Sequence, residues 1–148
     1  MLTVSDLLKT KKNELFTIGK TKPVLECVQV MNQHRIGALM VTSEQNQIEG
    51  IITERDILHA VSERNGSILN ITVQDIMTGK EKLVTASQND TIDLVMELMT
   101  SRRIRHIPVL EDGKLTGVIS IGDVVKNQLR HALVENESMK TYISGTSS

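Results

Sequence analysis

The chain has 148 residues, a length that fits one domain of ordinary size or two very small ones. Its 17 basic and 18 acidic residues leave a formal net charge of -1, which excludes the overall positive field that draws proteins to nucleic acid or to anionic membranes. Phe16 and Tyr142 are the only aromatic residues, so the stacking platforms of single-strand binding proteins are also missing.

A single cysteine, Cys27, cannot form an internal disulfide and fits a reducing compartment. No apolar run reaches the roughly 18 residues of a membrane-spanning helix. The N-terminus also lacks the basic-then-apolar order of a secretory signal. We therefore expect a soluble, cytoplasmic protein that contacts neither membrane nor nucleic acid.

The first half of the chain predicts the order strand, helix, strand, strand, helix. A short strand is expected near Phe16, and Pro23 suits the first turn of a helix, where a missing N–H costs nothing. Two β-rich runs follow at 36–41 and 48–52, and a second helix is expected to begin at Asp56. The first helix has the i, i+3, i+4, i+7 apolar spacing, at Val24, Cys27, Val28 and Met31.

The second half predicts the same order of elements, beginning with a short strand near Val84. Asp90 is expected to cap its first helix, and strands are expected at 104–110 and 114–119. Asp112 and Gly113 between these strands are a strong hairpin signal, because the turn needs positive φ angles that both residues tolerate. The helix repeats the amphipathic spacing, at Ile92, Val95, Met96 and Met99.

The two halves align with each other over most of their length. Phe16 aligns with Val84, and GIITERD at 50–56 aligns with GVISIGD at 117–123. Such self-similarity predicts units that bury their apolar faces on each other. We predict an α/β (α+β) fold of two tandem β-α-β-β-α motifs, related by a pseudo-twofold axis and packed through their sheets. The expected divisions are a first motif at 1–62, a linker at 63–71, a second motif at 72–130 and a C-terminal helix and tail at 131–148.

Each signature places a hydroxyl residue three positions before an aspartate, as Thr53 with Asp56 and Ser120 with Asp123. One interpretation is structural, because this spacing forms a capping box at the start of a helix. The other is functional. A helix N-terminus offers N–H groups to a phosphate, and a carboxylate accepts hydrogen bonds from both hydroxyls of a ribose.

The duplicated order of elements, the run RHIPVLEDGKLTGVIS and the two G-h-h-[ST]-x-x-D endings resemble a tandem pair of CBS domains, or Bateman module, over about residues 3–130. The resemblance implies a non-catalytic regulatory module that binds AMP, ADP, ATP or NAD(H), with S-adenosylmethionine as an alternative, in clefts between the copies. It also implies a homodimer and a separate regulated protein.

The resemblance assigns the ligand contacts residue by residue. Ribose is assigned to Asp56 and Asp123, phosphate to Thr53, Ser120, Arg105 and His106, and the adenine wall to Ile107 and Pro108. Arg55, which has no counterpart in the second signature, could give one site a second cation for phosphate. Successive residues of a strand point to opposite faces, so we expect Arg105 rather than His106 to enter a cleft. The first copy has Gly37, Ala38 and Met40 where the second has Arg105, His106 and Pro108, so we expect two clefts of unequal affinity.

Two other functions are weighed against this one. A structural or protein-interaction module would use both signatures only as helix caps and leave its clefts empty. A hydrolase would recruit Ser120, His106 and Asp123, but GVISIG lacks the G-x-S-x-G elbow. No catalytic residue is therefore predicted. The four histidines have no second histidine or cysteine at metal-ligand spacing, so no metal site is predicted either.

Overall fold

The computed structural model describes residues 2–11 and 15–146, with side chains described as far as residue 137. The first half contains α1 (Val4–Thr10), β1 (Thr17–Ile18), α2 (Val24–His34), β2 (Ala38–Thr42), β3 (Ile48–Thr53) and α3 (Glu54–Glu63). The second half contains α4 (Val73–Ile76), β4 (Thr78–Gly79), a 3-10 turn (Lys80–Lys82), α5 (Ile92–Arg102), β5 (His106–Glu111), β6 (Lys114–Ser120) and α6 (Ile121–Thr146).

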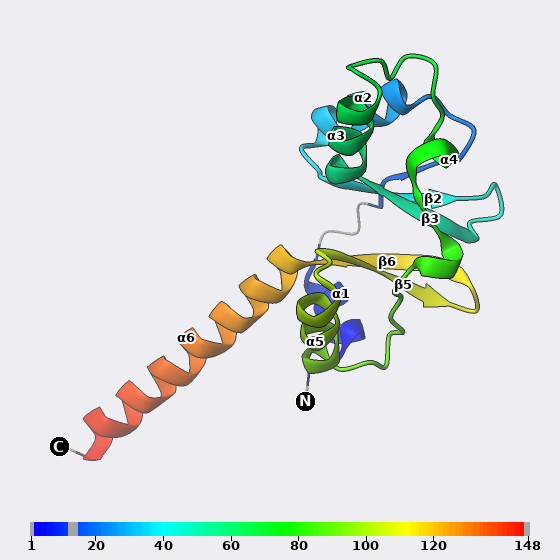
Figure 1. Ribbon diagram of the computed structural model, residues 1–148. Helices are drawn as coiled ribbons and strands as arrows, with labels where there is room; N and C mark the ends of the chain where they lie inside the picture. The colour runs from blue at the N-terminus through cyan, green and yellow to red at the C-terminus, as the bar shows by residue number, and fades with distance from the viewer. Residues whose placement is uncertain (1, 12–14, 147–148) are drawn as a thin grey trace.

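The molecule is layered, with two sheets face to face and helices outside them (Figure 1). Within the described residues, one sheet has the strand order β1-β2-β3-β4 and the other consists of β5 and β6. Helices α2 and α3 lie outside the first sheet, and α1 and α5 lie outside the second. Between the sheets, Met40, Ile48, Ile51 and Leu115 form a buried cluster. The two motifs therefore pack through their sheets, as predicted.

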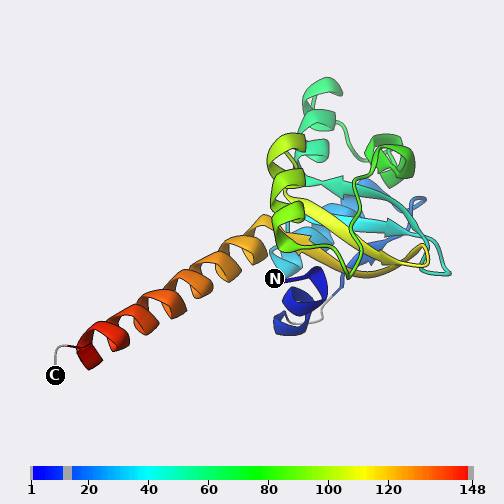
Figure 2. The ribbon, with the colours of Figure 1, turned by 90° about the horizontal axis from the view of Figure 1, so that it is seen from below.

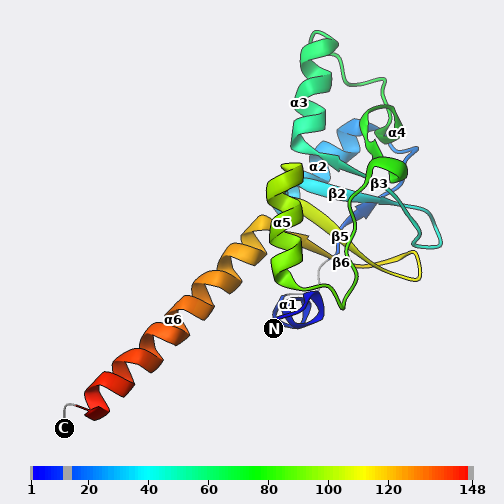
Figure 3. The ribbon, with the colours of Figure 1, turned by 60° about the horizontal axis from the view of Figure 1, so that its bottom comes forward.

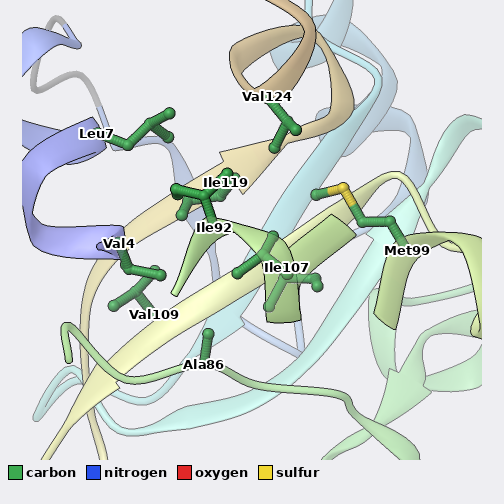
Figure 4. Close-up of a cluster of buried hydrophobic side chains, with 10 residues drawn as sticks. Val4, Leu7, Ala86, Ile92, Met99, Ile107, Val109, Ile119 and Val124 are labelled. Atoms are coloured by element: carbon green, nitrogen blue, oxygen red, sulfur yellow. The ribbon is translucent and has the colours of Figure 1, made fainter. Parts of the chain in front are cut away.

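The short helices α1 and α4 each complete the core of the opposite half. Val4 and Leu7 of α1 are buried beside Ile92 and Ile119 of the second half (Figure 4). In the same way, Val73 of α4 is buried in the core of the first half. The divisions at 1–62 and 72–130 thus follow the sequence repeat, whereas each hydrophobic core crosses them.

Backbone hydrogen bonds show the same exchange of segments between the two halves, in which α1 packs on the second half and α4 on the first. The Ile92 N–H donates to the Leu2 carbonyl at 3.0 Å, and the aligned Val24 N–H donates to the Ile71 carbonyl at 3.0 Å. The pseudo-twofold relation therefore extends to hydrogen bonds between segments that are far apart in sequence.

The helix starts differ from the prediction by one or two residues, with α3 beginning at Glu54 rather than at Asp56. Pro23 is the N-cap of α2 rather than its first residue. Asp90 does not cap α5, because its carboxylate accepts from the Ser87 N–H at 2.8 Å and closes the preceding turn. The N-cap is Thr91, whose hydroxyl accepts from the Leu94 N–H at 3.2 Å.

The strand expected near Val84 is reduced to a single parallel bridge between Ala86 and Val109. In the first half, the equivalent segment forms β1, which pairs in parallel with β2. The hairpin between β5 and β6 is confirmed, with Asp112 and Gly113 at φ angles of 53° and 79°.

Helix α6 leaves the two-sheet body and projects away from it in every view (Figures 1, 2 and 3). It is continuous from Ile121 to Thr146, so the division expected at 131 is not a break in the backbone. In the described part of the chain, no helix has the length and apolar character needed to cross a membrane.

Candidate functional site

A cleft of about 340 Å³ lies where the two halves meet the end of α1. This volume is near the lower end of the roughly 300–1,000 Å³ typical of small-molecule sites. The second half contributes His106, Gly117, Val118, Ser120 and Asp123, the first half contributes Phe16, Arg35, Ile36, Gly37, Ala38 and Met40, and the N-terminal segment contributes Leu8, Lys11 and Leu15.

The sheet register brings the polar residues of the second half together. His106 begins β5 and lies opposite Ser120, the last residue of β6. Helix α6 begins at the next residue, Ile121, whose N–H donates to the Arg105 carbonyl at 2.9 Å. This bond fixes the start of α6 against β5, so Asp123 faces the same cleft as His106.

Ser120 and Asp123 form a capping box at the start of α6. Oδ2 of Asp123 accepts from the Ser120 N–H and from its hydroxyl, both at 2.9 Å, and the Asp123 N–H donates back to Ser120 Oγ at 3.2 Å. Thr53 and Asp56 form the same box at the start of α3, with the corresponding distances at 2.9, 3.0 and 3.3 Å. Both signatures therefore cap helices, and only their surroundings distinguish them.

Lys11 distinguishes the two boxes. Its Nζ donates to Asp123 Oδ2 at 2.8 Å and to the Val118 carbonyl at 2.7 Å. The two charged side chains are 31% and 19% exposed, so water screens the pair only in part. No ion pair to Asp56 is formed within the described residues.

The Lys11 contact affects the pKa of Asp123. Burial alone would raise that pKa, but the hydrogen bonds from Lys11 and Ser120 outweigh burial and lower it below the ordinary value. The carboxylate therefore contributes stability above the unfolded-state pKa of about 3.9, and this contribution is lost as the pH falls through the lower folded-state pKa.

His106 is held mainly in its neutral form. Burial, followed by the positive charge of Lys11, lowers the pKa of its imidazole, although Asp123 acts in the opposite direction. A neutral imidazole keeps one donor and one acceptor nitrogen available to a ligand.

The structure brings three of the predicted site residues into this cleft, namely His106, Ser120 and Asp123. His106 lines the cleft, whereas Arg105 is exposed and lies outside the lining, so the expected contact of Arg105 with a ligand stays a prediction. Ile107 is fully buried in the second core, because strand alternation points it away from the cleft and toward α5. Its side chain does not line this cleft.

The other predicted residues also lie outside the cleft. Pro108 is buried but does not line it, and Arg55 is exposed on the first turn of α3. Thr53 is confined to its capping box. Asp56 lines a separate hollow of about 230 Å³ between α3 and α4, together with His59, Ala60, Glu63, Arg64, Asp75 and Ile76.

Sequence reasoning missed Lys11, Arg35 and the role of Ala38. Ala38 was compared with His106 as part of a separate first-copy cleft, whereas the structure places both in one cleft. Arg35 reaches it from the C-cap of α2, where its φ of 54° is in the left-handed region. The sequence does contain a signal for Lys11. The segments that precede the two motifs, TVSDLLKTK at 3–11 and TVQDIMTGK at 72–80, resemble each other and both end in a lysine, Lys11 in the first and Lys80 in the second.

The model of the family described as "CBS domain" matches residues 4–63 and 73–130, one match for each half. The chain belongs to the CBS domain family. It is a tandem CBS pair, and the predicted family and fold class are both confirmed. Tandem CBS pairs are regulatory modules.

Relatives of this CBS pair cover most of the chain. The CBS domain-containing protein CBSX3, mitochondrial, of Arabidopsis thaliana is 38% identical over 149 residues, which is 97% of this chain and 72% of the relative. The crystal structure of a CBS-domain containing protein from Agrobacterium tumefaciens is 40% identical, with a TM-score of 0.79, and the match covers 85% of this chain and 98% of that one.

Two structures with the same fold contain ligands. The structure of CBSX2 in complex with AMP has a TM-score of 0.74 at 21% identity and covers 89% of this chain and 99% of its own. The CBS pair of protein MJ0100, in complex with 5-methylthioadenosine and S-adenosyl-L-methionine, also has a TM-score of 0.74, at 24% identity, and covers 85% of this chain and 94% of its own.

Proposed function

We propose that this CBS pair is a non-catalytic regulatory module that binds an adenosine-containing ligand in the cleft at Asp123. One observation carries the proposal: a capped helix start with a carboxylate, Ser120 to Asp123, opens into a cleft lined by both copies. A carboxylate can accept both ribose hydroxyls, and the N–H groups at a helix start attract phosphate.

The remaining lining suits the rest of such a ligand. Ile36, Ala38 and Met40 offer apolar contacts for a base, while Arg35 and His106 offer donors for a phosphate. The small volume favours a mononucleotide such as AMP over the larger NAD(H). Two structures of the same fold hold adenosine compounds, which supports this ligand class.

A thermal-shift panel with AMP, ADP, ATP, NAD(H) and S-adenosylmethionine tests the proposal. A ligand at one hundred times its dissociation constant stabilises the folded state by about 2.7 kcal/mol. For a chain of this length each kcal/mol raises Tm by about 2 to 4 °C, so binding gives a clear shift. No shift with any of the five compounds contradicts the proposal. Chemical change of the bound compound during long incubation, detected by mass spectrometry, contradicts the non-catalytic part and favours a hydrolase.

One observation favours a structural module as the competing function. Thr3 with Asp6 and Thr72 with Asp75 form the same box at the starts of α1 and α4, where both aspartates are exposed. The box is therefore a recurrent capping device in this chain. Only a comparison of Asp123 with an equivalent capping aspartate separates capping from binding.

We further propose that the module is a homodimer paired through α6. Val125, Leu129 and Leu133 repeat at every fourth position and form an exposed apolar stripe, hereafter the α6 stripe, with each residue 56–60% exposed. Between residues 125 and 137 the charges of the helix are segregated, because Lys126 and Arg130 precede Glu135 and Glu137. Antiparallel pairing of two copies would place the basic segment of one beside the acidic segment of the other.

Replacing Leu129 with glutamate is expected to convert a dimer to a monomer, because it places two charges in the paired stripe. Light scattering coupled to size exclusion measures the change. Leu69→Glu is the matched control, since Leu69 is 70% exposed and lies in the connection between α3 and α4. A monomeric wild-type protein, or a dimer that survives Leu129→Glu, contradicts this interface.

The regulated protein and the compartment stay predictions from the sequence. We expect the module to act on a separate protein in the cytoplasm, although the Arabidopsis relative is mitochondrial by name.

A further inference from the structure

Lys11 reaches the cleft from the end of α1, a helix whose other residues anchor it in the second core. It is the C-cap of α1, and Val4 and Leu7 of that helix are fully or almost fully buried in the second core. The Lys11 N–H donates to the Leu8 carbonyl at 3.3 Å, which ends the helix. The ammonium group therefore reaches the cleft from a rigid base, through a flexible four-carbon stem.

The Lys11 ammonium occupies the oxygen that a ribose would use. Oδ2 of Asp123 accepts from Lys11 and from both donors of Ser120. The Ser120 bonds belong to the capping box and hold the start of α6, so Lys11 is the donor that can leave without unwinding a helix. A ribose that engages both carboxylate oxygens through its two hydroxyls must displace it.

The charges that line the cleft do not balance when Lys11 leaves Asp123. Lys11 and Arg35 are cations, Asp123 is the one acidic residue of the lining, and His106 is a donor whose burial lowers its pKa and favours the neutral imidazole. Ribose hydroxyls hydrogen-bond to Asp123 but leave it anionic, so Lys11 and Arg35 against Asp123 leave one positive charge that has no counter-charge among the lining residues. An anionic group on the ligand supplies that charge, whereas a neutral ligand does not.

We infer that Lys11 closes the empty cleft by binding Asp123 and that, after ligand entry, it contacts the ligand's anionic group, so that Lys11 sets a preference for phosphate-bearing over uncharged adenosine compounds. This inference rests on the proposed function and deepens it. It makes Lys11 both a competitor for the ribose site and a contributor to phosphate affinity.

Calorimetric affinities for AMP and adenosine test the inference in wild type, Lys11→Met and Lys11→Arg. Hydrogen bonds to charged groups contribute about 1.5 to 3 kcal/mol, so loss of Lys11 is expected to lower the AMP-to-adenosine affinity ratio by about tenfold or more. Adenosine itself is expected to bind Lys11→Met at least as tightly as wild type, because the competing ammonium is gone. Lys11→Arg is expected to keep most of the preference for AMP.

Lys9→Met is the matched control, since Lys9 lies on the same helix and is exposed. It should leave the ratio unchanged, and urea unfolding confirms that each variant is folded. An unchanged AMP-to-adenosine affinity ratio in Lys11→Met, or weaker adenosine binding by that variant, overturns the inference. In that case AMP binding by the wild-type protein still supports the proposed function. Failure of wild type to bind any adenosine compound removes both.

Discussion

Replacing Asp123 with asparagine is expected to weaken AMP binding by about tenfold to a hundredfold, whereas Asp56→Asn should change it by less than about twofold. The estimate follows from the roughly 1.5 to 3 kcal/mol of a hydrogen bond to a charged group. Asparagine keeps the shape of aspartate and one acceptor oxygen, but it cannot accept both ribose hydroxyls as an anion. Titration calorimetry with AMP measures both variants.

Asp56 is a suitable control because the two aspartates have the same local role. Each is the third residue of its helix and accepts the N–H and hydroxyl of the preceding box residue. Weakening either cap is expected to lower the free energy of unfolding by about 1 kcal/mol. Asp123→Asn also weakens the Lys11 ion pair, so its stability cost should be somewhat larger. The two variants therefore differ chiefly in access to the cleft, which Asp123 lines and Asp56 does not.

The outcome separates the two functions considered for this chain. A large loss of affinity confined to Asp123→Asn supports ligand binding at the start of α6. Equal affinities in both variants, with a loss of stability in each, would leave the boxes as helix caps and favour the structural module. A loss confined to Asp56→Asn would move the binding site to the smaller hollow between α3 and α4.

The repeat predicted the fold because it constrains both halves at once. A hairpin at Asp112 and Gly113, or a capping box at Thr53, is a local signal with several interpretations. The same order of elements found twice requires two units that can cover each other's apolar face. The observed two-sheet core with Met40 and Leu115 between the sheets is the physical form of that requirement.

The cleft was only partly predictable, because its walls come from three separate segments. His106, Ser120 and Asp123 lie close together in the second signature region, and sequence reasoning found them. Lys11 and Arg35 enter from elements whose positions depend on the exchange of α1 and α4 between the halves. An alignment of the two copies pairs Lys11 with Lys80 and Arg35 with Arg103, whereas of these four residues only Lys11 and Arg35 line the cleft.

Replacing Gly50 with alanine is expected to lower the free energy of unfolding by about 1 to 3 kcal/mol, the usual cost of overpacking a well-filled site. A Cβ atom on Gly50 would overlap the Thr78 carbonyl oxygen and would lie 3.2 Å from Met77 Sδ. The oxygen belongs to the backbone of β4, which pairs with β3 at Gly50 and Ile51. Relief of the clash therefore requires the strand itself to move.

Gly117 is the aligned glycine of the second half and provides the matched variant. A Cβ atom there would lie 2.9 Å from Leu8 Cδ2 and 3.0 Å from Leu8 Cδ1, the far end of a flexible side chain. Rotation of Leu8 relieves this clash, so Gly117→Ala should cost clearly less than Gly50→Ala. Urea unfolding, fitted with one m value for the wild-type protein and both variants, measures the two losses in the free energy of unfolding.

Equal costs would show that the two halves surround their glycines in the same way. Unequal costs would show where the repeat departs from symmetry, because the first half fills the space beside Gly50 with the backbone of β4 and the second fills it with a side chain of α1. The same departure separates the two signatures. Strand β4 packs beside the first one, whereas α1 ends beside the second and leaves a cleft that Lys11 closes with its side chain.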